Sequence, residues 1–110
     1  MLVELDIFSG RPNPRWQLDE QGAEALRELV KRLATTSDSP PDPPGLGYRG
    51  FLLTDETGEF RAYGGYVTGP DGAYADPTSS VERFLRDRIP TEFHELRQRV
   101  PTEPERPTEA

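Results

Sequence analysis

A proline-rich run between residues 35 and 45 constrains the fold more than any other stretch of this chain. It reads Thr-Thr-Ser-Asp-Ser-Pro-Pro-Asp-Pro-Pro-Gly. Proline fixes φ and has no backbone N–H, so such a run forms neither a helix nor the interior of a sheet. Neither flank is large enough to be a separate domain. We therefore expect one domain over residues 1–100, crossed by a proline-rich strap at residues 36–45.

The segment before the strap predicts one strand and one helix. Residues 2–8 alternate in polarity, which is typical of a strand with one buried face and one mixed face. Asp19 has the character of an N-cap, and apolar residues then recur at helical spacing, which predicts a helix over about residues 20–35. This apolar stripe consists of Leu26, Leu29, Val30 and Leu33.

The segment after the strap is rich in strand signals. Residues 46–54 and 59–67 predict two antiparallel strands, because the Asp-Glu-Thr-Gly sequence at 55–58 is typical of a hairpin turn. Gly64-Gly65 interrupts the second strand, which indicates a bulge or a close approach of backbone or ligand. A Gly-Pro-Asp-Gly turn then leads into a short strand at residues 73–75.

Two more helices are predicted near the end of the chain. Asp76-Pro77 indicates an N-cap followed by proline at the first helical position. A third, short helix is expected from Thr91. After residue 100 there is nothing to bury, so residues 101–110 are expected to form a disordered acidic tail.

The order of these elements limits the fold class. Strands and helices do not alternate strictly, which disfavours a doubly wound parallel sheet. We expect an α+β, two-layer domain with a mainly antiparallel sheet of about four strands and two main helices packed on one face. The position of strand 2–8 within the sheet stays open.

Charge and composition exclude several classes of partner. The net charge of −7 disfavours broad binding to nucleic acid or to an anionic membrane. The chain has no cysteine, which suits a reducing compartment, and its first residues lack the pattern of a signal peptide. We therefore expect a cytoplasmic protein. Its modest core makes a homodimer possible.

The first candidate site is the loop at residues 9–16, which contains two prolines, a glycine and the only tryptophan. A stiff loop of this kind can hold hydroxyl, amide and guanidinium donors in a fixed shape toward a carboxylate or phosphate. The alternative is a structural corner in which the prolines brace the chain and the tryptophan covers the core. The candidate ligand-binding residues are Ser9, Arg11, Asn13, Arg15 and Trp16.

The second candidate site is the sheet face that the helices leave uncovered. We expect Tyr48 and one of Tyr63 or Tyr66 on it, since tyrosine offers apolar area with a polar tip. Glu4, Asp6 and Leu52 are expected on the same face, with Arg49 or Arg61 within reach. The alternative is an ordinary solvated face.

Residue types suited to catalysis are scarce. Glu4 and Asp6 are two apart on one strand, so their carboxylates point the same way and could form an acid/base pair or half of a divalent-metal site. Solvated strand acids are far commoner. His94 is the only histidine and is expected at the surface. We assign no catalytic residue, metal ligand or cofactor.

Three function classes remain. The favoured one is a non-catalytic binding or accessory domain that recognises a protein, a peptide or a small anionic ligand through loop 9–16 and the open sheet face. The second is a small cofactor-free enzyme, such as an isomerase, cyclase or lyase, with Asp6 or Glu4 as acid/base and Arg11 or Arg15 beside it. The third is a structural subunit that only associates.

Overall fold

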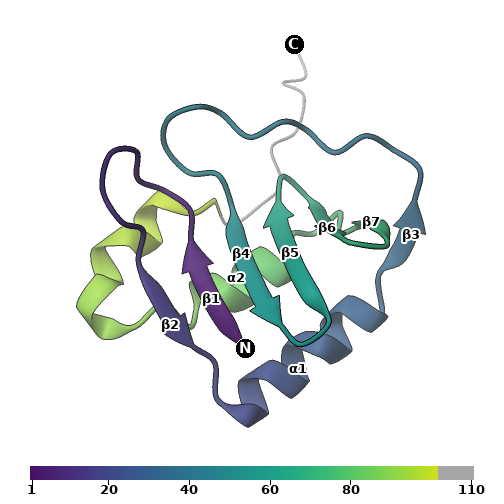
Figure 1. The fold of residues 1–110 in the computed structure, drawn as a ribbon, viewed down its shortest axis with the longest axis horizontal. Coiled ribbons are helices and arrows are strands. Elements are labelled where there is room, and N and C mark those ends of the chain that lie inside the picture. Colours follow the sequence, from purple (N-terminus) through teal and green to yellow (C-terminus); the bar gives the residue numbers. More distant parts are fainter. Residues whose placement is uncertain (102–110) are drawn as a thin grey trace.

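The computed structural model describes residues 1–101 and is an α+β domain with one antiparallel sheet and three helices (Figure 1). All but the first residue of the expected tail, 101–110, lies outside the described residues. The strands are β1 (Leu2–Leu5), β2 (Arg15–Gln17), β3 (Ala34–Thr36), β4 (Phe51–Asp55), β5 (Gly58–Tyr63), β6 (Tyr66–Gly69) and β7 (Gly72–Ala75). The helices are α1 (Glu20–Lys31), α2 (Ser80–Arg86) and the 3₁₀ helix η1 (Thr91–Arg99).

The sheet has seven strands in the order β2-β1-β4-β5-β6-β7-β3, so the expectation of about four is wrong. One reason is that segment 59–67 is a hairpin rather than one strand. Gly64 and Gly65 have φ of 63° and 85°, and together they form the tight turn between β5 and β6. This double left-handed conformation is the one that a two-residue hairpin turn requires. The predicted bulge is therefore a turn.

Two short edge strands account for the rest of the difference. The end of the expected loop 9–16 forms β2, which pairs with β1, and the expected end of the first helix forms β3, which pairs with β7. α1 consequently ends at Lys31 rather than at about residue 35. β1 ends at Leu5 and β4 begins at Phe51, so both are shorter than predicted. β1 lies between β2 and β4.

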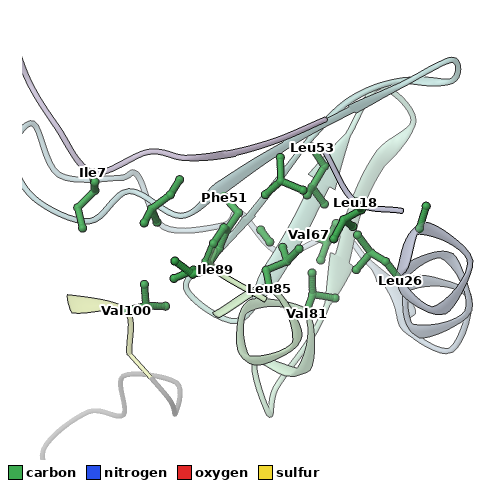
Figure 2. Packing of buried hydrophobic residues seen from close by; sticks show 14 residues of the cluster. Ile7, Leu18, Leu26, Phe51, Leu53, Val67, Val81, Leu85, Ile89 and Val100 are labelled. Atoms are coloured by element: carbon green, nitrogen blue, oxygen red, sulfur yellow. The ribbon is translucent and has the colours of Figure 1, made fainter. Parts of the chain in front are cut away.

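The core brings the inward side of the sheet together with α1 and α2 (Figure 2). Val3, Leu5 and Ile7 are buried, as the alternation in residues 2–8 predicts. They join Phe51 of β4 and Leu26 of α1 in one cluster. In the described part of the chain, no helix has the length and apolar character that crossing a membrane requires.

The start of α2 differs from the prediction. Asp76 is not the N-cap residue, and Pro77 precedes the helix instead of beginning it, since α2 starts at Ser80. The carboxylate of Asp76 nevertheless accepts hydrogen bonds from the backbone N–H groups of Ser80 and Val81 at 3.0 and 2.9 Å. It therefore satisfies amides that no helical carbonyl reaches.

Candidate functional site

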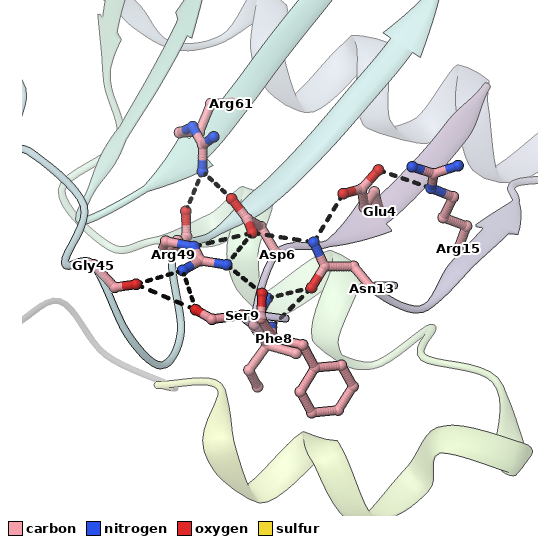
Figure 3. Close-up of polar contacts among 10 residues, drawn as sticks. Glu4, Asp6, Phe8, Ser9, Asn13, Arg15, Gly45, Arg49 and Arg61 are labelled. Atoms are coloured by element: carbon pink, nitrogen blue, oxygen red, sulfur yellow. Dashed lines mark hydrogen bonds and ion pairs between the residues drawn. The ribbon is translucent and has the colours of Figure 1, made fainter. Parts of the chain in front are cut away.

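Asp6 is the centre of a charged cluster at the end of β1. It is 8% exposed, and its Oδ1 accepts hydrogen bonds from Nε and Nη2 of Arg49 at 3.0 and 2.9 Å. Arg61 of β5 donates to Oδ2 at 2.9 Å (Figure 3). Burial alone would raise the pKa of Asp6, but the hydrogen bonds and charges of Arg49 and Arg61 outweigh burial and lower that pKa. Asp6 is a carboxylate held between two guanidinium groups.

Asn13 ties the loop back onto β1. Its side-chain Oδ1 accepts from the backbone N–H groups of Ile7 and Phe8 at 3.1 and 2.8 Å. Its Nδ2 donates to Glu4 at 2.9 Å and to Asp6 at 3.2 Å. One amide therefore bridges both carboxylates, which confirms that Glu4 and Asp6 point the same way. Asn13 has used its donors and acceptors inside the molecule.

Two further loop residues are also engaged internally. Arg15 donates from Nε to Glu4 at 2.9 Å. Ser9 accepts from Nη1 of Arg49 at 3.1 Å and donates to the carbonyl oxygen of Gly45 at 3.3 Å, which joins the loop to the strap (Figure 3). These contacts support the bracing role that the sequence left open for much of loop 9–16.

Trp16 and Tyr48 pack toward the core. The ring of Trp16 meets Phe51 edge-on at a centroid distance of 6.4 Å. Tyr48, expected on the open sheet face, instead donates its hydroxyl to Oε2 of Glu82, a buried residue of α2, at 2.5 Å. Its ring contacts Phe51 and Tyr63. Burial raises the pKa of both Tyr48 and Glu82.

Tyr63 and Tyr66 face one another across the β5–β6 hairpin and so lie on the same side of the sheet. With Arg61 they line a hollow of about 250 Å³. Its other wall comes from the strap, at residues 40–43. The strap therefore lies beside Tyr63 and Tyr66.

Arg11 is the exception in the loop. Its guanidinium lies over the ring of Phe8, 3.7 Å from the centroid, and makes no hydrogen bond or ion pair within residues 1–101. Arg11 borders a groove of about 440 Å³ between the loop and η1, which we call the loop–η1 groove. Its walls are formed by Phe8, Arg11, Pro12, Asn13, Pro14 and Arg15 on one side and by Glu92, Phe93, Glu95 and Leu96 on the other.

Several residues of the site carry little signal in the sequence. Arg49 and Arg61 were expected near the open face, but their shared partner Asp6 depends on strand order, which the sequence left open. Nothing in the sequence distinguishes Glu82, which is buried, from an ordinary solvent-exposed residue of a short helix. The η1 wall of the groove depends on how the last helix packs, which no local pattern indicates.

The two carboxylates of the predicted acid/base pair or metal half-site both accept hydrogen bonds from the protein. Glu4 accepts from Asn13 and Arg15, and Asp6 accepts from two arginines. His94 is exposed, with Nδ1 3.0 Å from the carbonyl oxygen of Thr91. Nowhere in residues 1–101 do three or more acidic or histidine side chains gather as they would around a metal ion.

Comparisons with protein-family models, with curated proteins and with solved structures find no match for this chain.

Proposed function

We propose that this protein is a non-catalytic recognition domain, and that it binds a segment of another protein in the loop–η1 groove. The observation that carries the proposal is Arg11. The side chains of Ser9, Asn13 and Arg15 are hydrogen-bonded inside the molecule, whereas Arg11 is exposed and has no anionic partner in the described chain.

The cluster around Asp6 supports this proposal because it holds the loop rigid. A binding group on a rigid loop loses little conformational entropy when its partner arrives. Phe8 adds to this effect, since its ring lies 3.7 Å from the guanidinium carbon of Arg11 and restricts the freedom of that side chain. A planar guanidinium presented in this way suits a carboxylate.

The groove walls indicate the rest of the partner's chemistry. Pro12, Phe93 and Leu96 supply apolar surface next to Arg11, and Glu92 and Glu95 border the η1 side. An acidic side chain would be accepted at the arginine side and repelled at the glutamate side. We therefore propose a protein or peptide segment that carries a carboxylate beside an apolar side chain, and a free small anion is the weaker candidate.

The enzyme alternative receives less support. A general base needs a carboxylate that is free to accept a proton near neutral pH. Asp6 is held by two arginines with its pKa lowered, and Glu4 is held by Asn13 and Arg15.

We also propose a two-layer architecture, with α1 and α2 on one face and the other face open. Register and burial support it. Glu4, Leu52, Arg61 and Thr68 follow one another across four strands on the outward side, while Val3 and Phe51 point into the core. The open face is mixed in polarity, so we propose it as a secondary surface, for a second copy or a partner.

The absence of cysteine supports a cytoplasmic setting.

The proposal is tested by selecting random displayed peptides on the wild-type protein and measuring their affinities by calorimetry. We expect enriched peptides to carry Asp or Glu next to an apolar residue. Arg11→Ala should weaken them about tenfold or more, because a charge-assisted hydrogen bond is lost. The melting temperature should fall by no more than a few degrees, since an exposed cation–π contact contributes about 0.5–1 kcal/mol.

Arg88→Ala is the matched control. Arg88 is also exposed and also stacks on a phenylalanine, Phe84, at 3.6 Å, but it does not border the groove. It should leave peptide affinity unchanged. The proposal would be contradicted if Arg11→Ala and Arg88→Ala weakened peptide binding equally, or if Arg11→Ala left peptide affinity unchanged. A fall in the melting temperature of Arg11→Ala clearly larger than that of Arg88→Ala would favour the bracing role.

A further inference from the structure

A second hollow, of about 210 Å³, opens between α1 and the end of the β4–β5 hairpin. It is distinct from the loop–η1 groove, because no residue borders both. Leu26, Val30, Leu53 and Phe60 form its apolar wall together with Met1. Leu26 and Leu53 belong to the buried core, so this hollow lies against the edge of the core.

Two cations of α1 stand at the mouth of this hollow. Arg27 and Lys31 are separated by one helical turn and therefore point the same way. Their side chains are 45% and 72% exposed, and each forms a long ion pair on the helix surface, Arg27 with Glu24 at 3.9 Å and Lys31 with Glu28 at 3.7 Å. Such exposed pairs contribute little, so either cation can exchange its glutamate for a ligand anion at small cost. Arg27 also lies 3.9 Å from Asp55, whose side chain is 10% exposed.

Asp55 is the one acid that borders the hollow. Its Oδ1 is occupied by Thr57, which donates from its backbone N–H at 2.8 Å and from its hydroxyl at 2.6 Å. These hydrogen bonds lower the pKa of Asp55. Of the charged side chains that border the hollow, Arg27 and Lys31 are cations and Asp55 is a carboxylate, while Glu24 and Glu28 lie outside its lining.

We propose that this hollow binds a small carboxylate with an apolar tail, such as a short-chain fatty acid. The tail would occupy the space between Val30, Leu53 and Phe60, and the carboxylate would lie at Arg27 and Lys31. The volume fits this class of ligand, since a cavity of roughly 150 Å³ holds benzene, and 210 Å³ leaves room for a chain of about six carbons.

The test uses three probes of equal chain length and different charge: hexanoate, 1-hexanol and hexylammonium. Each is titrated into the ¹⁵N-labelled full chain, and amide shifts are followed by NMR. We expect saturable shifts around Leu26, Val30 and Phe60, with hexanoate bound about fivefold more tightly than hexanol, as two exposed cations warrant. Hexylammonium should bind most weakly.

Substitutions separate the charge from the cavity. The double substitution Arg27→Ala and Lys31→Ala should reduce hexanoate affinity to that of hexanol and leave hexanol unchanged. Arg32→Ala removes an exposed cation of the same region that does not border the hollow, so it should have no effect. Val30→Phe should fill the hollow and abolish all three titrations.

Three results would overturn the proposal. These are the absence of saturable shifts for hexanoate, equal affinity for all three probes, or shifts confined to residues outside the hollow. The peptide experiment on Arg11 is independent of each of them, so this inference and the proposed function can fail separately.

Discussion

Asp6 is the side chain on which the shape of the loop depends most. A buried carboxylate is costly unless donors surround it. Here Arg49, Arg61 and Asn13 all donate to it, and they come from three separate segments of the chain. Arg61 also donates to the carbonyl oxygen of Arg49, which fixes the entry into β4. The cluster therefore connects the loop, the end of the strap and the middle of the sheet.

Replacing Asp6 by asparagine should destabilise the protein by about 3 kcal/mol, because it leaves two partly buried guanidinium groups without a counter-charge. Urea unfolding measures this change. Asp87→Asn removes a carboxylate whose side chain is 68% exposed and 3.9 Å from Arg86, and it should cost under about 0.5 kcal/mol. Similar losses for the two variants would show that the Asp6 cluster contributes no more than surface charge.

The β5–β6 hairpin shows how a local conformation and a distant contact act together. Gly64 has a φ of 63°, which a residue with a Cβ adopts only under strain. A Cβ at this position would also come within 2.7 Å of Pro41 of the strap. The turn and the strap therefore pack so closely that glycine is required for two independent reasons.

Gly64→Ala should destabilise the protein by about 2 kcal/mol or more, because a left-handed conformation costs about 1–2 kcal/mol for a residue with a Cβ. The 2.7 Å approach of the new Cβ to Pro41 adds to that cost. Gly45→Ala is the matched control within the strap. No atom lies within 4 Å of its added Cβ, and its φ is not in the left-handed range. It should be neutral or stabilise slightly, because alanine restricts the unfolded chain. Thermal unfolding of both variants makes the comparison, and an unaffected Gly64→Ala would contradict it.

The sequence predicted several elements whose signal lies within one segment of the chain, although it placed the start of α2 too early. The stripe from Leu26 to Leu33 predicted α1, the alternation at Val3, Leu5 and Ile7 predicted the buried face of β1, and residues 55–58 predicted a hairpin. Strands β2 and β3 were missed, since each has three residues and is defined by its pairing, β2 with β1 and β3 with β7. Edge strands this short have no periodicity of their own.

The site was only partly predictable for a related reason. The sequence singled out the loop because of its unusual composition, and Arg11 stands out there in the structure as well. The sequence alone could not show that Asn13 is hydrogen-bonded inside the molecule while Arg11 makes no hydrogen bond within residues 1–101. This difference depends on which side chains the fold brings together. Asn13 meets Glu4 and Asp6 through the fold of β1 onto the loop, and Tyr48 meets Glu82 across 34 residues. Such contacts follow from tertiary packing.

The domain as a whole contains buried carboxylates whose pKa values shift in opposite directions. The pKa of Asp6 and that of Asp55 are lowered in the folded protein, so each stabilises the fold above its ordinary value of 3.8. That contribution is lost as the pH falls through the lowered pKa. Burial raises the pKa of Glu82 above its ordinary value of 4.5. Its ionisation therefore opposes folding as the pH rises.

Together these shifts predict that the free energy of unfolding is greatest near about pH 4–5. Below that range Asp6 and Asp55 gain protons and the fold loses their contribution, while above it the buried Glu82 loses its proton at a cost. Urea unfolding across pH 3–8 should show this maximum, and Glu82→Gln, which keeps an acceptor for Tyr48, should remove the decline on the alkaline side. Glu92→Gln, on exposed η1, controls for the loss of one negative charge and should keep that decline. If Glu82→Gln and wild type decline in parallel, the decline comes from the general charge of −7 and not from the buried glutamate.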